Sequence, residues 1–246
     1  MSETIGPTET PASMRITGEI YDLIYCNKDY AAEAAKISDL IKHRCESGGN
    51  NILEAACGTG NYMQHLRGDF IVEGFDLAVG QVEEAKRKLP DMRIFQADMV
   101  DFEAGQTYDA LICLFSSIGY LKTKERLDNA VANMAGHTNP GGLVIVEAWL
   151  KAEDFKDGHV SLEAVSNDAM SVARMGLSSK EGIVSTIDMH HMVGTSSGIE
   201  HIMERHQLAM YSDEDFTDAF TKAGLELEID PTGLMGRRLC IGKKPL

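Results

Sequence analysis

Hydrophobic and polar positions follow two different periods along the first 150 residues of the chain. Short apolar runs between turn residues predict buried strands, and amphipathic segments with the period of an α-helix predict helices. The strands predicted in this way are 52–56, 71–76, 92–95, 110–115 and 143–149. The predicted helices are 30–44, 79–89 and 127–137, the last ending at the Asn-Pro-Gly-Gly turn of residues 139–142. Strands separated by such helices favour right-handed crossovers and a largely parallel sheet.

The pattern changes after residue 150, where apolar and polar residues alternate between turn-forming glycines and serines. This alternation predicts antiparallel strands at 170–176, 183–193 and 199–210. A helix capped by Ser212 and two final strands, 225–229 and 238–242, then complete the first sheet. We therefore expect an α/β fold with a doubly wound, mostly parallel, seven-stranded sheet and a small antiparallel β insertion.

Three parts of the chain are expected to behave differently. Residues 1–18 are predicted to be a flexible N-terminal tail, since they are polar and lack both a basic region and an apolar run. The same features predict a cytoplasmic protein. Residues 19–150 and 212–246 should form one α/β ligand-binding domain, and 151–211 an antiparallel lid or substrate subdomain.

One glycine-rich turn indicates where a ligand binds. The run from Asn51 to Gly60 reads as a buried strand followed by Ala-Cys-Gly-Thr-Gly, which places backbone N–H groups where a nucleotide-like ligand can lie. Asp76 closes the next predicted strand, roughly 20 residues further on, and is placed to bind two ribose hydroxyls.

Two features that this turn lacks exclude some classes of nucleotide ligand. Met63 stands where a dinucleotide fingerprint needs its third glycine, and no Gly-Lys-Ser/Thr follows for a phosphate loop. S-adenosylmethionine fits, because it has a ribose but no phosphate. Asp98 and Met99 follow the third strand and could bind the adenine. The alternative for each acid is a solvated strand-end carboxylate.

Charge and composition exclude other classes of protein. A formal net charge of −15 argues against nucleic-acid or anionic-membrane partners, which need a basic surface. The five cysteines include no C-x-x-C pair, so we expect neither a disulfide framework nor a zinc site. His190 and His191 should point to opposite faces of a strand and cannot chelate jointly, so no metal is predicted. His190 is the histidine that we expect to face an acceptor pocket.

These features resemble the class I S-adenosylmethionine-dependent methyltransferases, which have a Rossmann-like fold. From Tyr21 onward the chain is similar to the N,N-dimethyltransferases of dTDP-3-aminodeoxysugars, of the desosamine and mycaminose type. The matching pieces are Tyr21-Asp-Leu, Lys28-Asp-Tyr30, Ala56-Cys-Gly-Thr-Gly60, Asp98-Met-x-Asp101-Phe, Phe115-Ser-Ser-Ile-Gly119, Val146-Glu-x-Trp149, Glu153-x-Phe155-x-x-Gly158, Arg174 and Gly236-Arg-x-Leu239.

The resemblance implies two groups of site residues. Those expected around the cofactor are Tyr30, Ala56, Cys57, Gly58, Gly60, Asp76, Leu77, Asp98, Met99 and Leu114. Those expected around the substrate are Tyr21, Trp149, Arg174, His190 and Arg237, with the two arginines facing a diphosphate. A guanidinium fork offers bidentate bonds to phosphate oxygens, although surface ion pairs are the alternative for both arginines.

The predicted reaction is N-methylation of a dTDP-linked aminodeoxysugar by in-line methyl transfer. Such a transfer needs water excluded and the amine aligned rather than a nucleophile, so Tyr21 and Tyr120 are the predicted catalytic residues, as orienting groups. Two alternatives remain: methylation of another small molecule at nitrogen, oxygen or carbon, and a non-catalytic cofactor-binding protein. A homodimer through the antiparallel strands is also expected.

Overall fold

The computed structural model describes residues 16–246, so most of the predicted tail lies outside the described residues. Ile16 is buried, and Thr17 caps the first helix by accepting the N–H of Ile20 at 3.3 Å. Residues 16–18 are therefore part of the folded structure. No helix within residues 16–246 is long and apolar enough to cross a membrane.

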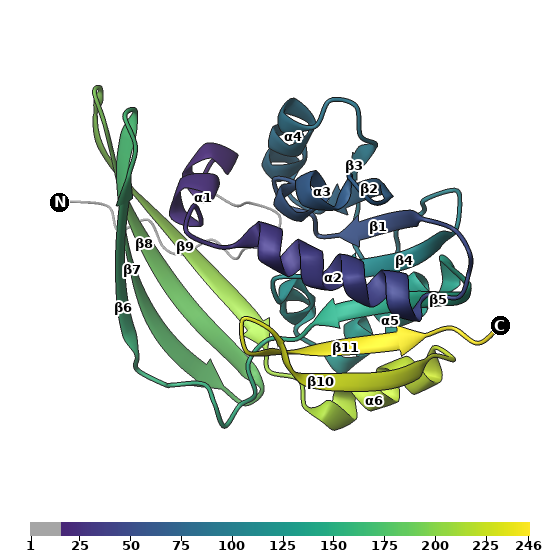
Figure 1. Cartoon of the computed structure of the whole chain (residues 1–246). Coiled ribbons are helices and arrows are strands. Elements are labelled where there is room, and N and C mark those ends of the chain that lie inside the picture. The colour runs from purple at the N-terminus through teal and green to yellow at the C-terminus, as the bar shows by residue number, and fades with distance from the viewer. Residues whose placement is uncertain (1–15) are drawn as a thin grey trace.

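The chain folds into helices and strands in the order that Figure 1 shows. The helices are α1 (Gly18–Ile24), α2 (Tyr30–Arg44), α3 (Asn61–Leu66), α4 (Val79–Lys88), the 3-10 helix η1 (Ser117–Leu121), α5 (Lys124–Gly136) and α6 (Asp213–Lys222). The strands are β1 (Asn51–Ala55), β2 (Ile71–Asp76), β3 (Ile94–Gln96), β4 (Tyr108–Cys113), β5 (Thr138–Glu147), β6 (Val160–Ser166), β7 (Met170–Glu181), β8 (Val184–Thr195), β9 (Gly198–Ala209), β10 (Glu226–Leu234) and β11 (Arg237–Lys243).

The larger sheet has seven strands in the order β10-β11-β5-β4-β1-β2-β3. Strands β1 to β5 pair in parallel, whereas β11 is antiparallel to both β5 and β10. The strand order reverses beside β1, and in open α/β sheets ligands bind at such a switch point, outside the carboxyl ends of the strands. The fold-class prediction is confirmed.

Helices cover both faces of this sheet because the central strands are apolar on both sides. Every residue of β4 is buried. Helices α2, α3 and α4 pack in one hydrophobic cluster, and α5 and α6 pack in the other. This packing on both faces fixes the positions of the carboxyl ends of the central strands and of the turns that follow them.

The turn predicted at residues 139–142 is wrong, since these residues lie inside β5. Tyr108 of β4 pairs with Thr138, but Ala110 pairs with Leu143, so the Asn-Pro-Gly-Gly residues form an irregularity in the strand. Proline and glycine are tolerated within a sheet at such bulges. Helix α5 ends at Gly136, as the periodicity indicates.

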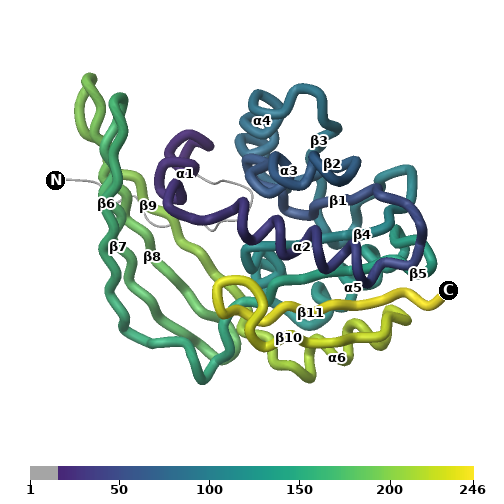
Figure 2. The backbone as a smooth tube through the Cα atoms, in the orientation of Figure 1, coloured from purple at the N-terminus to yellow at the C-terminus, as the bar shows by residue number. Residues whose placement is uncertain are grey.

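The insertion is a four-stranded antiparallel sheet in the order β6-β7-β8-β9. The sequence analysis does not predict its first strand, β6, although apolar and polar residues alternate over 160–164. Figures 1 and 2 show this long, curved sheet to one side of the α/β part, with α1 between the two. Ile20, Leu23 and Ile24 of α1 pack against Val172 and other apolar residues of the sheet. Helix α1 therefore fills one end of the space between the two sheets.

Candidate active site

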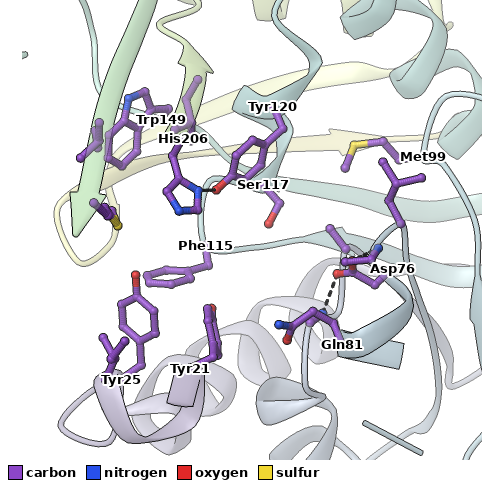
Figure 3. Close-up of a pocket in the computed structure, with 18 of the residues that line it drawn as sticks. Tyr21, Tyr25, Asp76, Gln81, Met99, Phe115, Ser117, Tyr120, Trp149 and His206 are labelled. Carbon is purple, nitrogen blue, oxygen red and sulfur yellow. Dashed lines mark hydrogen bonds between the residues drawn. The ribbon is translucent and has the colours of Figure 1, made fainter. Parts of the chain in front are cut away.

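A cavity of about 560 Å³ lies between the α/β part and the antiparallel sheet. It is lined by the turns after β1 and β2, by η1, by α1 and by one face of the antiparallel sheet. Figure 3 shows Asp76 and Gln81 at one end and Tyr25 and Trp149 at the other. The volume falls in the range of small-molecule sites.

The glycine turn and Asp76 are joined by backbone hydrogen bonds. The N–H of Gly58 donates to Oδ2 of Asp76 at 2.9 Å, and the N–H of Ala78 donates to Oδ1 at 2.8 Å. Burial raises the pKa of Asp76, while these N–H groups lower it by favouring the carboxylate. Gly58 has φ +55° and faces the cavity without a Cβ. The turn thus presents open backbone beside a fixed acid.

The predicted cofactor residues divide into three groups. Those that line the main cavity are Ala56, Gly58, Asp76, Leu77, Asp98 and Met99. Tyr30, Cys57 and Leu114 line a smaller cavity that shares Ala56 and Gly58 with it. Gly60 lines neither of the two: with φ +81° it is the N-cap of α3, and a Cβ there would lie 2.7 Å from Leu89. Asp98 forms an ion pair of 2.7 Å with Arg126.

Glu54 is a site residue that the sequence reasoning missed. Its carboxylate lines the smaller cavity, and Oε2 is buried without a hydrogen-bond partner among residues 16–246. Burial, together with the charge of Asp76, holds the pKa of Glu54 well above its ordinary value. A buried acid within an apolar strand was the available signal. An unpaired carboxylate here fits a ligand that brings an ammonium group, as the amino-acid end of S-adenosylmethionine does.

Tyr21 and Tyr120 both reach the main cavity, from α1 and η1 respectively (Figure 3). The hydroxyl of Tyr120 lies 2.8 Å from Nδ1 of His206 on β9. Burial raises the pKa of both phenols above the ordinary value, so each is a neutral hydrogen-bonding group at physiological pH.

Four cationic side chains line the cavity from separate parts of the chain. They are Lys28, Arg174, Arg237 and Arg126, the last of which is paired with Asp98. Arg174 donates to the hydroxyl of Tyr25 at 2.9 Å and pairs with Glu163. Lys28, which was not predicted as a site residue, pairs with Glu33 and lies 4.7 Å from the ring centroid of Phe115.

Arg237 is held mainly by aromatic rings. Its guanidinium carbon lies 4.8 Å from the ring centroid of Trp149 and 5.5 Å from that of Phe115. Its ion pair with Glu147 spans 3.9 Å, and burial raises the pKa of Glu147 to about 7. The charge of Arg237 is therefore only partly neutralised within the protein.

Backbone strain gathers around the same cavity. Phe115 and Ser116 have φ +53° and +61°, values that residues with a side chain rarely adopt. Ala56 and Met235, which also line the cavity, have positive φ as well. The strained turn is stabilised by Glu147, which accepts the Phe115 N–H at 2.6 Å. Such strain persists where the surrounding structure requires it, often at functional sites.

Of the predicted substrate residues, Trp149 lies at the cavity and His190 does not. Trp149 lines the cavity and donates from Nε1 to Ser185 at 2.9 Å. The prediction that His190 faces the acceptor pocket is wrong. His190 lies outside the cavity and stacks on His201, because alternation along β8 turns its side chain to the other face of the sheet. His206 lines the cavity instead. No group of three or more metal-ligating side chains occurs among the described residues.

Known proteins are similar to this chain in sequence and in fold. Residues 52–142 match a family described as "Methyltransferase domain". Over 228 residues the chain is 39% identical to dTDP-3-amino-3,4,6-trideoxy-alpha-D-glucopyranose N,N-dimethyltransferase of Streptomyces venezuelae, covering 91% of this chain and 96% of that one. The chain belongs to the S-adenosylmethionine-dependent aminodeoxysugar N-methyltransferases.

Solved structures of this methyltransferase family have the same fold along their whole length. The crystal structure of Streptomyces venezuelae DesVI matches with a TM-score of 0.87 and 39% identity, over 93% of this chain and 98% of that one. CalS10, an amino pentose methyltransferase from Micromonospora echinaspora in a structure with bound SAM, matches with a TM-score of 0.82 and 30% identity, over 96% of this chain and all of that one.

Proposed function

We propose that this methyltransferase transfers a methyl group from S-adenosylmethionine to the amino group of a dTDP-linked aminodeoxysugar. The observation that carries the proposal is the placement of Arg174 and Arg237, from β7 and β11, on a cavity whose opposite end holds Asp76. In a chain of net charge −15, two arginines that line the same cavity favour an anionic group on the ligand.

The cofactor half of the site would be built on the β1 and β2 ends. Asp76 would accept from the ribose hydroxyls with lone pairs that the Gly58 and Ala78 N–H groups leave available, since a carboxylate has about four acceptor sites. Glu54 would pair with the ammonium group, and Met99 would pack on the adenine. When bound, the cofactor supplies an activated methyl group, so no protein nucleophile is needed.

The acceptor half would be built on α1, η1 and the antiparallel sheet. Arg237 and Arg174 would bind the diphosphate, with the rings of Trp149 and Phe115 fixing the Arg237 fork. Tyr21 and Tyr120 would hold the amine by hydrogen bonds and exclude water from it. Alignment of this kind is what an in-line displacement requires.

The antiparallel sheet would act as a substrate subdomain and α1 as a lid. Support for both roles comes from position. Arg174, Ile187 and Met189 reach the cavity from the sheet, and Tyr21 of α1 and Tyr25, the C-cap of α1, reach it from the other side. A homodimer would be formed through the outer face of β6 and β7. There Leu162 and Met175 pair across the strands with exposed side chains.

The test is methyl transfer to a dTDP-3-aminodeoxysugar, followed by mass spectrometry. The proposal expects a product that carries one or two added methyl groups, and dTDP alone should bind. Arg237→Ala should weaken dTDP binding by about tenfold to a hundredfold, the usual worth of a charge-assisted pair. Arg44→Ala, at an exposed ion pair with Glu228, is the matched control and should change nothing. Unchanged dTDP affinity in Arg237→Ala would contradict the assignment.

A further inference from the structure

Three buried side chains, His206, Glu204 and His191, extend in a line from the Tyr120 hydroxyl. Orientation of the substrate amine by Tyr120 does not by itself require them. Nδ1 of His206 is 2.8 Å from the Tyr120 hydroxyl, and Nε2 of His206 is 3.5 Å from Oε2 of Glu204. The same Oε2 is 3.3 Å from Nε2 of His191. Figure 3 shows the first of these contacts facing the cavity.

The sheet builds this line from three neighbouring positions on one face. Glu204 and His206 are two residues apart on β9, and His191 pairs with Ile202 beside them on β8. Side chains at such positions share a face. The Ile16 N–H donates to Glu204 Oε1 at 3.3 Å, which helps to orient the carboxyl group.

Burial constrains the charge of this group. Glu204 and His191 have side chains only 1% exposed, and that of His206 is 7% exposed. A carboxylate buried to this degree needs a cationic partner or a proton, and the imidazoles of His191 and His206 lie 3.3 and 3.5 Å from it. If Nε2 of neutral His206 carries a proton toward Glu204, Nδ1 remains free to accept from Tyr120.

We propose that His206, acting through the Tyr120 hydroxyl, takes up the proton that the substrate amine releases, and that Glu204 and His191 stabilise it there. The inference rests on the proposed function. The substrate amine arrives as an ammonium. One of its N–H bonds breaks and leaves the electron pair on nitrogen for the methyl transfer, the Tyr120 oxygen accepts that proton, and the hydroxyl proton of Tyr120 passes to Nδ1. Tyr120 stays neutral and His206 becomes an imidazolium beside Glu204. Each round converts an ammonium into a methylated ammonium and releases one proton.

Other charged and titratable groups line the same cavity. They are Tyr21 of α1, Tyr25 and Lys28 after it, Asp76 at the end of β2, the ion pair of Asp98 and Arg126, Glu163 of β6, Arg174 of β7 and Arg237 of β11. Arg174 is paired with Glu163, and Asp76 lies at the opposite end of the cavity (Figure 3). The phenols are weak acids. His206 is therefore the basic group in contact with the Tyr120 hydroxyl.

The kinetic test compares pH–rate profiles of the full chain with a dTDP-aminosugar. The wild-type rate should change little with pH above neutrality, because His206 takes the proton within the active site. His206→Asn keeps an acceptor near Tyr120 but cannot take the proton. Its rate should rise about tenfold per pH unit above neutrality, because only amine already deprotonated in water can react. Tyr120→Phe should show the same slope, and the double variant should be no worse than either single variant. His201→Asn, on the opposite face of β9, is the matched control.

A second readout needs no turnover. With S-adenosylhomocysteine present, binding of the dTDP-aminosugar should protonate His206, seen in the ¹⁵N shifts of labelled histidine, and Tyr120→Phe should abolish this change. Wild-type and His206→Asn profiles of equal slope, or an unchanged His206 signal, would overturn the relay while leaving the proposed function intact. A wild type that methylates no dTDP-aminosugar would overturn the proposed function, and the relay with it.

Discussion

Glu147 gives the most quantitative prediction, because it is a fully buried carboxyl group at the end of β5. Burial raises its pKa from 4.5 to about 7, although Arg237 and the Phe115 N–H oppose the shift. The folded state then binds more protons than the unfolded chain between these two pH values. The free energy of unfolding must therefore fall as pH rises through that window. One pKa unit is worth about 1.4 kcal/mol, so the whole effect is about 3 kcal/mol.

Glu147→Gln removes the ionisation while keeping an oxygen that can accept the Phe115 N–H. The assay is urea unfolding of both proteins at pH 5 and pH 8, in which the other titrating groups cancel. Relative to the variant, the wild type should lose about 2.5 kcal/mol of stability between these pH values. Parallel behaviour of the two proteins would refute the reasoning, since Glu147 would then titrate alike in the folded and unfolded states.

The remaining predictions concern the glycine turn and the start of α6. Gly60→Ala places a side chain at φ +81° and should cost about 1–2 kcal/mol of stability, measured by urea unfolding, while S-adenosylmethionine affinity is retained. Gly58→Ala carries a similar strain but adds a methyl group at the cavity wall, so calorimetry should also show about tenfold weaker cofactor binding; equal affinities in the two variants would contradict this. Ser212→Ala removes one half of the capping box with Asp215 and should cost about 1 kcal/mol in urea unfolding, whereas an unchanged midpoint would disprove the cap.

The sequence predicts the parallel half of the fold well because each element carries its own signal. The apolar runs at β1, β2 and β4 and the capping box of α6 are local features, and the structure places them within a few residues of the prediction. Strand β6 pairs with the adjacent strand β7, and the alternation over residues 160–164 is a local signal that the prediction missed. The bulge at 139–142 instead depends on pairing with β4, which is distant along the chain. Proline and glycine there were read as a turn, because nothing local shows that Thr138 pairs with Tyr108.

The site residues also divide into those with a local sequence signal and those placed by contacts between distant segments. Asp76 and Gly58 are adjacent to a motif, so their place could be inferred from spacing. Lys28 and His206 reach the cavity only because α1 and the antiparallel sheet fold over it, and sequence alone gives no register for that contact. His190 was misplaced for this reason: the alternation was correct, but the face that meets the cavity was not known.

The most direct measurement is calorimetric titration of S-adenosylmethionine into the wild type and Asp76→Ala. The account predicts binding by the wild type and at least about tenfold weaker binding by the variant, since charge-assisted hydrogen bonds to the ribose are lost. Asp91→Ala, at an exposed ion pair with Arg67, should bind as the wild type does. No binding by the wild type, or equal affinity in Asp76→Ala, would contradict the central claim that the turn after β1 and the acid at the end of β2 hold the methyl donor.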